Sequence, residues 1–505
     1  MKPEIEQRAP PPIDVQRLNL LLVGLLLTAL ALYVVVQTMR GGTYALVSAA
    51  ILIGGVIWIV GGRRIWWLPL PIATSIGGLI WVGFRIYSHE IALLMAMLAL
   101  IPAVAINPKV MEQHRGRLPW TVYVLLFYLA AHLFGSLLIN RYLGGSGMGN
   151  IVRTYTMALW PLIFIPFFFH FGDTRWIRFM LLITFLGLLF RVVVGVYSYF
   201  FPGFIFFRGI NAFFLLSERG ALELRDAPLR LLILCLGLFG VVRYFTTKAA
   251  ILLSALLCTW FLLMGSGRVN VAMLGIVPFI WLLVQRRYFL MIGLIGLFGV
   301  AILLLNSNPE ILYELPKGPQ RALTVLLFEE RLDIQAQLEG SNLWHKELLR
   351  VGKEKWLESW RTFMIGNRVH PFDYTMGGLR PDFYHSIHVA ASIARYERAL
   401  WTIISTTGLL GGLLYASVFF RLLKGPVLHI LRNRVRTLND AVYFSAFVHC
   451  TLFILFSPVS GAFPGIELMW AGIAFALHRD EHNNAATEAP AVSLRTPHTH
   501  RQVIR

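Results

Sequence analysis

The fold class is decided by Tyr288-Phe-Leu-Met-Ile-Gly-Leu-Ile-Gly-Leu-Phe-Gly-Val-Ala-Ile-Leu-Leu-Leu305, a run of eighteen residues without a charge. A helix needs about 20 mainly apolar residues to cross the hydrocarbon core of a bilayer. Arg286 and Arg287 stand just before the run and Asn306 follows it, so polar residues bound it on both sides. The run therefore predicts a transmembrane helix.

Similar runs recur along the whole chain of 505 residues, of which 57% are hydrophobic and 14% are charged. Soluble domains carry about 25% charged residues on average, so the composition excludes a cytosolic enzyme, a secreted domain and a disordered chain. The three cysteines, Cys235, Cys258 and Cys450, all fall inside apolar runs, which excludes a disulfide scaffold. We predict an all-α, polytopic integral membrane protein.

Apolar runs bounded by charges, glycine or proline predict fourteen spans, or 12 to 13 if the shortest runs do not cross. Residues 17–305 hold the first eleven spans and residues 399–478 hold the last three. One large loop, residues 306–398, separates the two groups. The predicted spans are Leu18 to Val36, Thr43 to Val60, Ile65 to Phe84, Ile91 to Ile106, Trp120 to Ile139, Tyr155 to Phe171, Ile177 to Phe200, Leu231 to Phe245, Ala249 to Met264, Val269 to Val284, Tyr288 to Leu305, Ala399 to Phe420, Ala441 to Phe456 and Ala462 to His478.

The distribution of Lys and Arg predicts the orientation, because short cytoplasmic loops retain these residues. With a cytoplasmic N-terminus, 23 basic residues lie inside and 9 outside, once the large loop is set aside with its 12 basic and 12 acidic residues. The clusters Arg63–Arg64, Arg286–Arg287 and Arg421 to Arg436 then all face the cytoplasm. Both tails, residues 1–16 and 479–505, are predicted to be cytoplasmic, which makes the large loop periplasmic in a bacterial inner membrane.

The formal charge of +19 is then explained by topology and by contact with anionic lipid. Membrane lipids are therefore expected partners and nucleic acid is not. The N-terminal tail, with Pro10 to Pro12, is predicted to be extended before an uncleaved signal anchor. The polar C-terminal tail is predicted to be disordered.

The large loop is the predicted location of the chemistry. Its first half, Pro319 to Arg361, carries apolar residues at helical spacing, which predict helices that lie on the membrane surface or cap the bundle. Its second half contains Gly366-Asn-Arg-Val-His-Pro371 and Gly377-Gly-Leu-Arg-Pro-Asp-Phe-Tyr-His-Ser-Ile-His388, where glycine and proline interrupt regular helix. Cations beside histidines suit a site that holds a phosphate while moving a proton, and the alternative is a solvated loop whose charges have no role. The polar residues of this half are Arg368, His370, Asp373, Arg380, Asp382, His385 and His388.

A metal site in this loop is not predicted. Asp382, His385 and His388 are three residues apart, a spacing that on a helix can bring ligands together. The face that they form drifts around the helix, however, and no His-Glu-x-x-His motif accompanies them. We therefore predict neither a metal nor another cofactor.

Two arginines outside the loop are further candidates. Arg268, in Gly265-Ser-Gly-Arg268, is predicted at the outer turn between the ninth and tenth spans, where it would either clamp a lipid diphosphate or simply extend to the interface. Arg191 lies within the seventh span, where an unpaired cation is costly and indicates function. Its distance of about two turns from the outer end also lets it reach water.

At these residues the sequence resembles the O-antigen ligase and Wzy-type polysaccharide polymerase superfamily. The resemblance rests on Gly265-Ser-Gly-Arg268 leading into a span, on Glu358-Ser-Trp-Arg-Thr-Phe-Met-Ile-Gly366 in a single large late loop, and on Ser405-Thr-Thr-Gly-Leu-Leu-Gly-Gly412 at the start of a span. It covers roughly Leu252 to Phe420, about a third of the chain. In that family a His followed by Asn, Ser or Gln usually stands about ten residues before the Gly-Leu-Leu-Gly stretch, where this chain has Glu397-Arg398.

The resemblance implies glycan transfer on the periplasmic face, without metal, from an undecaprenyl-diphosphate-linked oligosaccharide to an acceptor glycan or lipid. It implies that Arg268, Arg361 or Arg368, and Arg380 bind the diphosphate and stabilise the charge that develops on it as it leaves. It also implies that a histidine orients or deprotonates the acceptor hydroxyl.

The catalytic histidine implied by the resemblance is His385, and His388 is the alternative. Further candidates are His370 and Arg191, together with Glu397 and Arg398, which occupy the usual histidine position of the family. Aromatic side chains expected to pack against sugar faces are Tyr374, Phe383, Tyr384 and Trp401.

Within the family, a polymerase is slightly favoured over a ligase, because the ligase histidine spacing is not matched. Three functions outside this family compete with glycan transfer of this type. A transporter or flippase of lipid-linked sugars is the alternative from another class, but it would be expected to carry internal repeats and mid-membrane ionisable groups, and Glu467 is the main acid within a span. A cell-wall polymerase of the shape, elongation, division and sporulation type would use Asp373 or Asp382. A multi-span glycosyltransferase with an acidic first outer loop is excluded, because Gln37 to Gly42 contains no acid.

Overall fold

The computed structural model describes residues 117–142, 148–171, 174–200, 226–264, 268–315, 332–367, 398–456 and 463–488, with short pieces at 70–71, 74, 79–81, 85–87, 319–320, 323–328 and 387. This described part is almost entirely helical. Seven of its helices are long and apolar enough to cross a membrane, and two shorter helices are also apolar. The predicted all-α class is confirmed for these residues, and the apolar helices are of the length and composition expected of a multi-pass membrane protein. The count of 12 to 14 spans and the periplasmic side of the large loop stay predictions.

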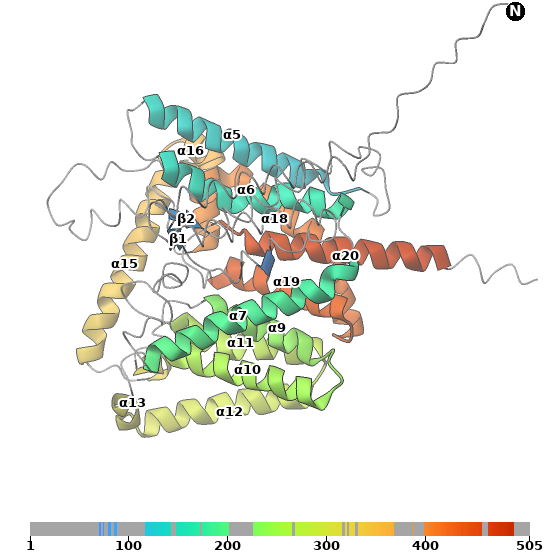
Figure 1. Cartoon of the computed structure of the whole chain (residues 1–505). Helices are drawn as coiled ribbons and strands as arrows, with labels where there is room; N and C mark the ends of the chain where they lie inside the picture. Colours follow the sequence, from blue (N-terminus) through green and yellow to red (C-terminus); the bar gives the residue numbers. More distant parts are fainter. Residues whose placement is uncertain are drawn as a thin grey trace, which may run out of the picture.

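The helices fall into a bundle and a set of loop helices (Figure 1). The bundle contains α5 (Trp120–Tyr142), α6 (Met148–Phe171), α7 (Ile177–Phe200), α9 (Asp226–Phe239), α10 (Phe245–Met264), α11 (Arg268–Val284), α12 (Tyr288–Ser307), α18 (Ala399–Asn433), α19 (Leu438–Phe456) and α20 (Ile466–Glu488), with η3 (Thr174–Trp176) before α7. The loop helices are α13 (Glu310–Glu314), η5 (Thr324–Leu326), α15 (Leu332–Leu357) and α16 (Trp360–Ile365).

The long helices lie roughly side by side, and α15 runs across one end of the bundle (Figure 1). We call this the loop end, because α13, α15 and α16 gather there. α15 and α16 both contact α18, so the predicted capping helices are confirmed as helices that pack on the bundle. Asn306, near the C-terminus of α12, ties the returning chain to this end, since its Nδ2 donates to the carbonyl of Leu326 at 2.9 Å and its Oδ1 accepts from the amide of Phe328 at 2.7 Å.

The opposite end, which we call the basic end, holds the α11–α12 and α18–α19 turns. Arg286 Nη2 donates to the carbonyls of Leu431 at 3.0 Å and Arg432 at 2.9 Å. Beside it, Gln285 Nε2 donates to the carbonyl of Val435 at 3.2 Å. Two basic clusters that the sequence predicted to face one side of the membrane therefore contact one another.

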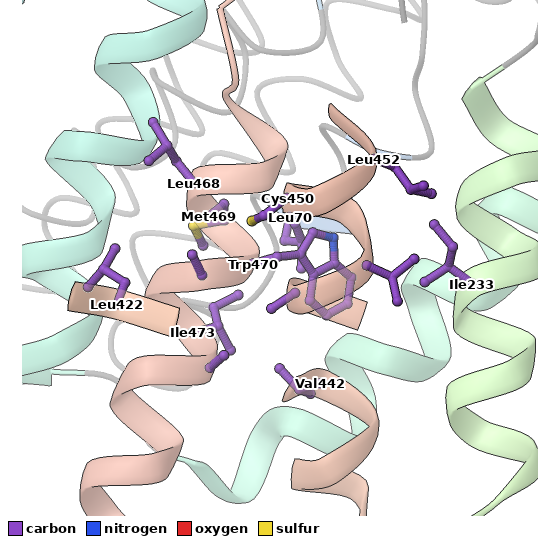
Figure 2. Packing of buried hydrophobic residues seen from close by; sticks show 14 of the residues in the cluster. Leu70, Ile233, Leu422, Val442, Cys450, Leu452, Leu468, Met469, Trp470 and Ile473 are labelled. Atoms are coloured by element: carbon purple, nitrogen blue, oxygen red, sulfur yellow. The ribbon is translucent and has the colours of Figure 1, made fainter. Parts of the chain in front are cut away.

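The core lies where α18, α19 and α20 meet α6 and α9. Figure 2 shows Trp470 of α20 extending toward Ile233 of α9 and Val442 of α19, with Leu422 of α18 on the other side of α20. All four side chains are buried. Burying large apolar side chains between helices stabilises the bundle through close packing, which is the main force between helices within lipid.

α12, the helix that carries the charge-free apolar run, differs from the core helices in its exposure. α12 buries none of its residues, and Phe289 and Leu297 are 93% and 66% exposed. A soluble protein rarely exposes so large an apolar surface, whereas lipid tails cover it at no cost. α12 is therefore a peripheral helix with the surface expected of a span in contact with lipid.

Each predicted span from Trp120 onward corresponds to a helix, but some predicted ends are wrong. The predicted span Leu231 to Phe245 is shorter at its end, since α9 stops at Phe239 and α10 begins at Phe245. The C-terminal tail is not disordered from residue 479, because α20 continues to Glu488. Contacts from α19 to the carboxylate of Glu481 hold this extension, and they are described below.

The predicted span Ile65 to Phe84 is contradicted at its end. Leu79–Trp81 and Arg85–Tyr87 form a short antiparallel pair, β1 and β2, with Ile80 opposite Ile86. Gly83 lies between the strands, and β-branched and aromatic residues within them favour strand over helix. The other three early spans, Leu18 to Val36, Thr43 to Val60 and Ile91 to Ile106, lie outside the described residues.

Replacing Trp470 by alanine is expected to destabilise the bundle by about 3–5 kcal/mol, because it empties a large buried site. Replacing the exposed Leu297 by alanine is expected to change stability by less than about 0.5 kcal/mol. Thermal unfolding of both variants in detergent checks this difference. Equal losses of stability would contradict the assignment of core and lipid-facing surfaces.

Candidate functional site

The candidate site begins at α16, whose start is set by a capping box. The amide of Thr362 donates to Ser359 Oγ at 3.1 Å, and the amide of Ser359 donates to Thr362 Oγ1 at 2.9 Å. This reciprocal pair satisfies two backbone donors and fixes where the chain turns after α15. The two-turn segment is thereby held in place at the loop end.

Aromatic packing fastens α15 and α16 to α18. Trp356 stacks on Phe363 with ring centroids 5.0 Å apart and meets Trp401 of α18 edge-on at 5.9 Å. Trp356 Nε1 also donates to the carbonyl of Phe363 at 2.9 Å. Such aromatic pairs contribute about 0.5–1.5 kcal/mol each beyond their buried area. Trp401, predicted as a sugar-stacking residue, is thus engaged in this packing.

The end of α16 crosses α18 at two glycines. Gly366 has φ 87° and Gly408 has φ 70°, both in the left-handed region that disfavours other residues. A Cβ on Gly366 would collide with the backbone of Thr406 and Gly408, and a Cβ on Gly408 would collide with the backbone of Met364. The crossing therefore depends on glycine at both positions.

The crossing coincides with a break in α18. Gly408 is non-helical, so the helix stops and restarts at this point. Two carbonyls at the break receive hydrogen bonds from other segments, since the amide of Asn367 donates to Ser405 at 2.8 Å and Tyr128 Oη of α5 donates to Thr407 at 2.6 Å. A broken helix is tolerated at membrane depth only where other groups satisfy its backbone.

A helix that restarts at a break presents its first-turn amides and the positive end of its dipole there. Three buried polar atoms on the adjoining segments have no hydrogen-bond partner among the described residues. They are Asn367 Nδ2, next to Gly366, and Thr402 Oγ1 and Thr406 Oγ1, which precede Gly408 in α18. Leaving a buried polar atom unpaired costs about 1–3 kcal/mol. Water or a polar ligand would recover that energy, so the break has the chemistry of a binding site for an anion.

A row of polar side chains on α5 runs from its contact with the break toward the C-terminal end of that helix. Tyr128, His132, Ser136 and Asn140 recur every fourth residue and so share one face of the helix. The rings of Tyr128 and His132 lie 4.6 Å apart, and Ser136 Oγ is 3.4 Å from the hydroxyl of Tyr155 on α6. Sequence reasoning missed this row, although its four-residue spacing within an apolar run was the signal that could have identified it.

The structure places two of the predicted arginines at the loop end. Arg361 is exposed in the first turn of α16, and Arg398 is exposed at the N-cap of α18. Arg268 begins α11, at the turn where it was predicted, and its side chain lies outside the description. Arg361 and Arg398 therefore stand on helices that pack together beside the break.

The predicted histidine region lies largely outside the described residues. This applies to Arg368, His370, Arg380, His385, His388 and Glu397. Ile387, between the two histidines, is helical and buried. The assignment of a catalytic histidine stays a prediction.

Arg191 is buried in α7 rather than open to water. Its Nη1 donates to the carbonyl of Thr74 at 2.8 Å, and Thr74 Oγ1 in turn donates to the carbonyl of Leu70 at 2.8 Å. Binding to backbone carbonyls is one of the ways in which a cation is accommodated within a membrane helix. This contact gives Arg191 a structural role in holding the segment around Thr74.

A buried ion pair that sequence reasoning missed joins α9 to α20. Arg230 Nη2 lies 3.5 Å from Glu467 Oε1, and both side chains are buried. The only sequence signal of this ion pair was the position of Arg230 and Glu467 at span ends, because nothing local indicates a partner 237 residues away.

His449 of α19 is a further buried polar residue in the bundle. Its ring stacks on Trp470 with centroids 5.6 Å apart, and its Nδ1 lies 2.7 Å from the carbonyl of Ser445.

One further cation lies at the loop end. Lys355, one residue before Trp356, is half-buried on α15. Burial lowers the pKa of the Lys355 ammonium, and the nearby carboxylate of Glu358 opposes this shift. Arg350, one turn away, is exposed and paired with Glu347 at 2.7 Å and Glu354 at 2.6 Å.

A scan against protein-family models finds no match to the chain, and a search of curated proteins finds none either. No family is therefore shown for the chain.

Replacing Gly408 by alanine is expected to displace α16 from α18, because the new Cβ would overlap the backbone of Met364. We expect a loss of about 2–4 kcal/mol, given the strain of a left-handed alanine and the steric overlap. Thermal unfolding of Gly408→Ala measures it, with Gly293→Ala on α12 as control, since a Cβ there has no neighbour within 4 Å. Equal stability of the two variants would show that the crossing is not constrained.

Proposed function

We propose that the protein is a glycosyltransferase that acts at the loop end of the bundle, on the periplasmic face of the bacterial inner membrane. The donor is an oligosaccharide on undecaprenyl diphosphate and the acceptor is a glycan or lipid. The observation that carries the proposal is the break in α18, where a helix restarts close to buried polar atoms that have no partner among the described residues. The two helices that pack together there, α16 and α18, also carry the exposed Arg361 and Arg398. That combination suits a diphosphate held at the edge of a membrane.

The reaction follows from these groups. An oxygen of the acceptor hydroxyl attacks the anomeric carbon of the donor sugar, and the bond from that carbon to the diphosphate oxygen breaks. Negative charge grows on the diphosphate as it leaves, so donors already oriented toward it lower the barrier. The guanidinium groups of Arg361 and Arg398 supply positive charge to the diphosphate. The backbone amides at the restart of α18 supply dipoles of fixed orientation.

The acceptor proton needs a base. His385, with His388 as the alternative, remains the proposed group because imidazole titrates near neutral pH. Arg268 and Arg380, with Arg368, complete the proposed set of diphosphate ligands. Their contribution is part of the proposal and rests on the sequence resemblance to the O-antigen ligase and Wzy-type superfamily.

The orientation is supported by the separation of the two ends. The basic clusters at Arg286 and Arg432 contact each other, and the loop helices gather at the other end (Figure 1). Retention of such clusters in the cytoplasm would place the loop end in the periplasm. Lipid-linked glycans are then presented on the side where the proposed site lies.

A flippase of lipid-linked sugars is the second candidate function. Two observations favour it, namely the interrupted helix α18 and the buried pair of Arg230 and Glu467 within the bundle. Discontinuous helices and internal ion pairs are typical of substrate sites in transporters. The two functions differ in one respect, because only the transferase breaks the bond between sugar and diphosphate.

Cells that lack the protein are expected to accumulate donor on undecaprenyl diphosphate. Mass spectrometry of the lipid-linked pool distinguishes the forms, since single repeat units indicate a polymerase and finished chains indicate a ligase. A pool identical to that of the parent strain would refute the proposal.

The variant carrying both Arg361→Ala and Arg398→Ala is expected to lower glycan transfer about 100-fold, the scale of losing charge-stabilising donors. Arg350→Ala is the matched control, because Arg350 is exposed on α15 and already paired with two carboxylates. We expect the control to retain activity within about twofold. Equal activities of the double variant and the control, measured as polymer per cell at matched protein level, would remove these arginines from the mechanism.

A further inference from the structure

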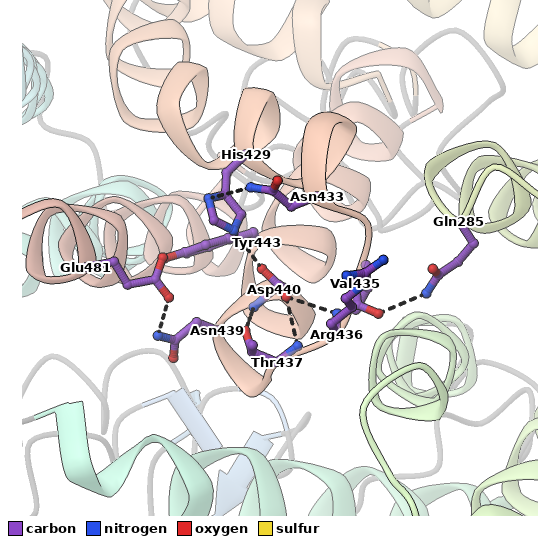
Figure 3. A network of polar contacts seen from close by, with 10 residues as sticks. All are labelled: Gln285, His429, Asn433, Val435, Arg436, Thr437, Asn439, Asp440, Tyr443 and Glu481. Atoms are coloured by element: carbon purple, nitrogen blue, oxygen red, sulfur yellow. Dashed lines mark hydrogen bonds and ion pairs between the residues drawn. The ribbon is translucent and has the colours of Figure 1, made fainter. Parts of the chain in front are cut away.

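A second polar cluster lies at the basic end, far along α18 from the break. Figure 3 shows His429 of α18, Asp440 and Tyr443 of α19, and Glu481 of α20 as neighbouring members of a network of polar contacts. His478 belongs to the same cluster, since its ring centroid lies 6.0 Å from that of His429 and 6.1 Å from that of Tyr443. The cluster joins three helices at the C-terminal part of the bundle.

Three of these side chains converge as metal ligands would. One nitrogen of His429, one nitrogen of His478 and one carboxylate oxygen of Glu481 lie within 4.8 Å of one another. His478 and Glu481 are three residues apart on α20, so they share a face of that helix. An ion midway between three atoms at that spacing would be about 2.8 Å from each, so shifts of under about 1 Å would reach the bond lengths of about 2.0–2.2 Å for zinc.

The carboxylate of Glu481 is already oriented. Tyr443 Oη donates to its Oε2 at 3.0 Å, and Asn439 Nδ2 donates to its Oε1 at 2.7 Å. Each oxygen keeps a further lone pair, because a carboxylate oxygen accepts more than one hydrogen bond. Donors of this kind commonly hold a ligating carboxylate in position.

The His429 ring is oriented by a second carboxylate. Its Nε2 lies 3.0 Å from Asp440 Oδ1, and Asp440 is itself fixed because its Oδ2 accepts from the amides of Arg436 at 2.9 Å and Thr437 at 2.7 Å. A histidine whose one nitrogen faces a carboxylate presents the other as a ligand. That other nitrogen, Nδ1, has only a long contact of 3.4 Å to Asn433 Nδ2 among the described residues.

His478 is placed by close approach to α18. A Cβ on Gly425 would lie 2.5 Å from Cδ2 and 2.6 Å from Nε2 of the His478 ring, so only glycine leaves room for that edge of the imidazole. The nitrogen on the opposite side of the ring, Nδ1, is buried and has no hydrogen-bond partner among the described residues. An unpaired buried lone pair is costly, and a metal ion would satisfy it.

From this arrangement we infer that His429, His478 and Glu481 bind one divalent transition-metal ion at the basic end. Two imidazoles and one carboxylate form a ligand set typical of zinc, with a fourth position left for water. The prediction of no metal, which rested on the large loop, did not cover this site. The ligands here are 49 residues apart along the chain and become neighbours only when α18 packs against α20.

The site is independent of the proposed glycan transfer, which was placed at the other end of the bundle. By linking α18 to α20, a bound ion would clamp the C-terminal helices together. It would also hold the α20 extension beyond residue 478 against α19. The expected effect is on stability, and it does not require the chain to be an enzyme.

The test measures zinc binding directly. The full chain, purified in detergent with an affinity tag that contains no histidine and stripped with chelator, is dialysed against Zn²⁺ and analysed by metal quantification and calorimetry. We expect one tightly bound Zn²⁺ per chain, with affinity at least tenfold lower in His429→Gln and in His478→Gln. The control is His482→Gln, an exposed histidine that directly follows Glu481 and does not belong to the cluster, which is expected to bind like the parent.

A second measurement, the melting temperature, distinguishes the loss of a metal ligand from the loss of folded structure. Zn²⁺ is expected to raise the melting temperature of the parent and of His482→Gln by several degrees, and to leave those of His429→Gln and His478→Gln unchanged. Folding of each variant is checked by its gel-filtration profile without metal. No stoichiometric zinc in the parent, or equal affinity in the His429 and His478 variants, would overturn the inference.

Discussion

The constraint on which the structure depends is that backbone polar groups inside a membrane must find partners within the protein. Most of the chain meets it with uninterrupted helices. At Gly408 the chain meets it differently, since Asn367 and Tyr128 donate to carbonyls that the broken helix has released. This solution requires α16 to press against α18, which is sterically allowed because Gly366 and Gly408 carry no side chains. The only described interruption within a long helix thereby becomes an ordered, polar location.

The two ends of the bundle have different chemistry. At the loop end, arginines and restarted helix backbone suit a large anion that arrives along the membrane. At the basic end, side chains tie α18, α19 and α20 together through the Glu481 carboxylate and the His429 imidazole. Between the ends, apolar packing around Trp470 gives the bundle a close-packed core. A reaction at one end and a clamp at the other are compatible, because separate sets of residues build them.

Local sequence was sufficient for much of the fold and for little of the site. The charge-free run from Tyr288 predicts a helix because lipid tolerates nothing else there, and α12 follows that run closely. Ends of helices were less predictable, since the extension of α20 depends on contacts of Glu481 with α19. Ser405-Thr-Thr-Gly408 was noted as a motif, but its break appears only when Gly366 is placed against it. The pairing of Arg230 with Glu467 is likewise a product of packing over long sequence separation.

We propose that the bond between sugar and diphosphate is broken at the loop end of the bundle. The most direct measurement reconstitutes the purified protein in liposomes with an undecaprenyl-diphosphate-linked oligosaccharide and an acceptor, and follows both lipid and glycan by mass spectrometry. For a glycosyltransferase we expect release of free undecaprenyl diphosphate together with a lengthened or acceptor-linked glycan. Donor that remains chemically intact while moving between leaflets would contradict this proposal and would establish the flippase function instead.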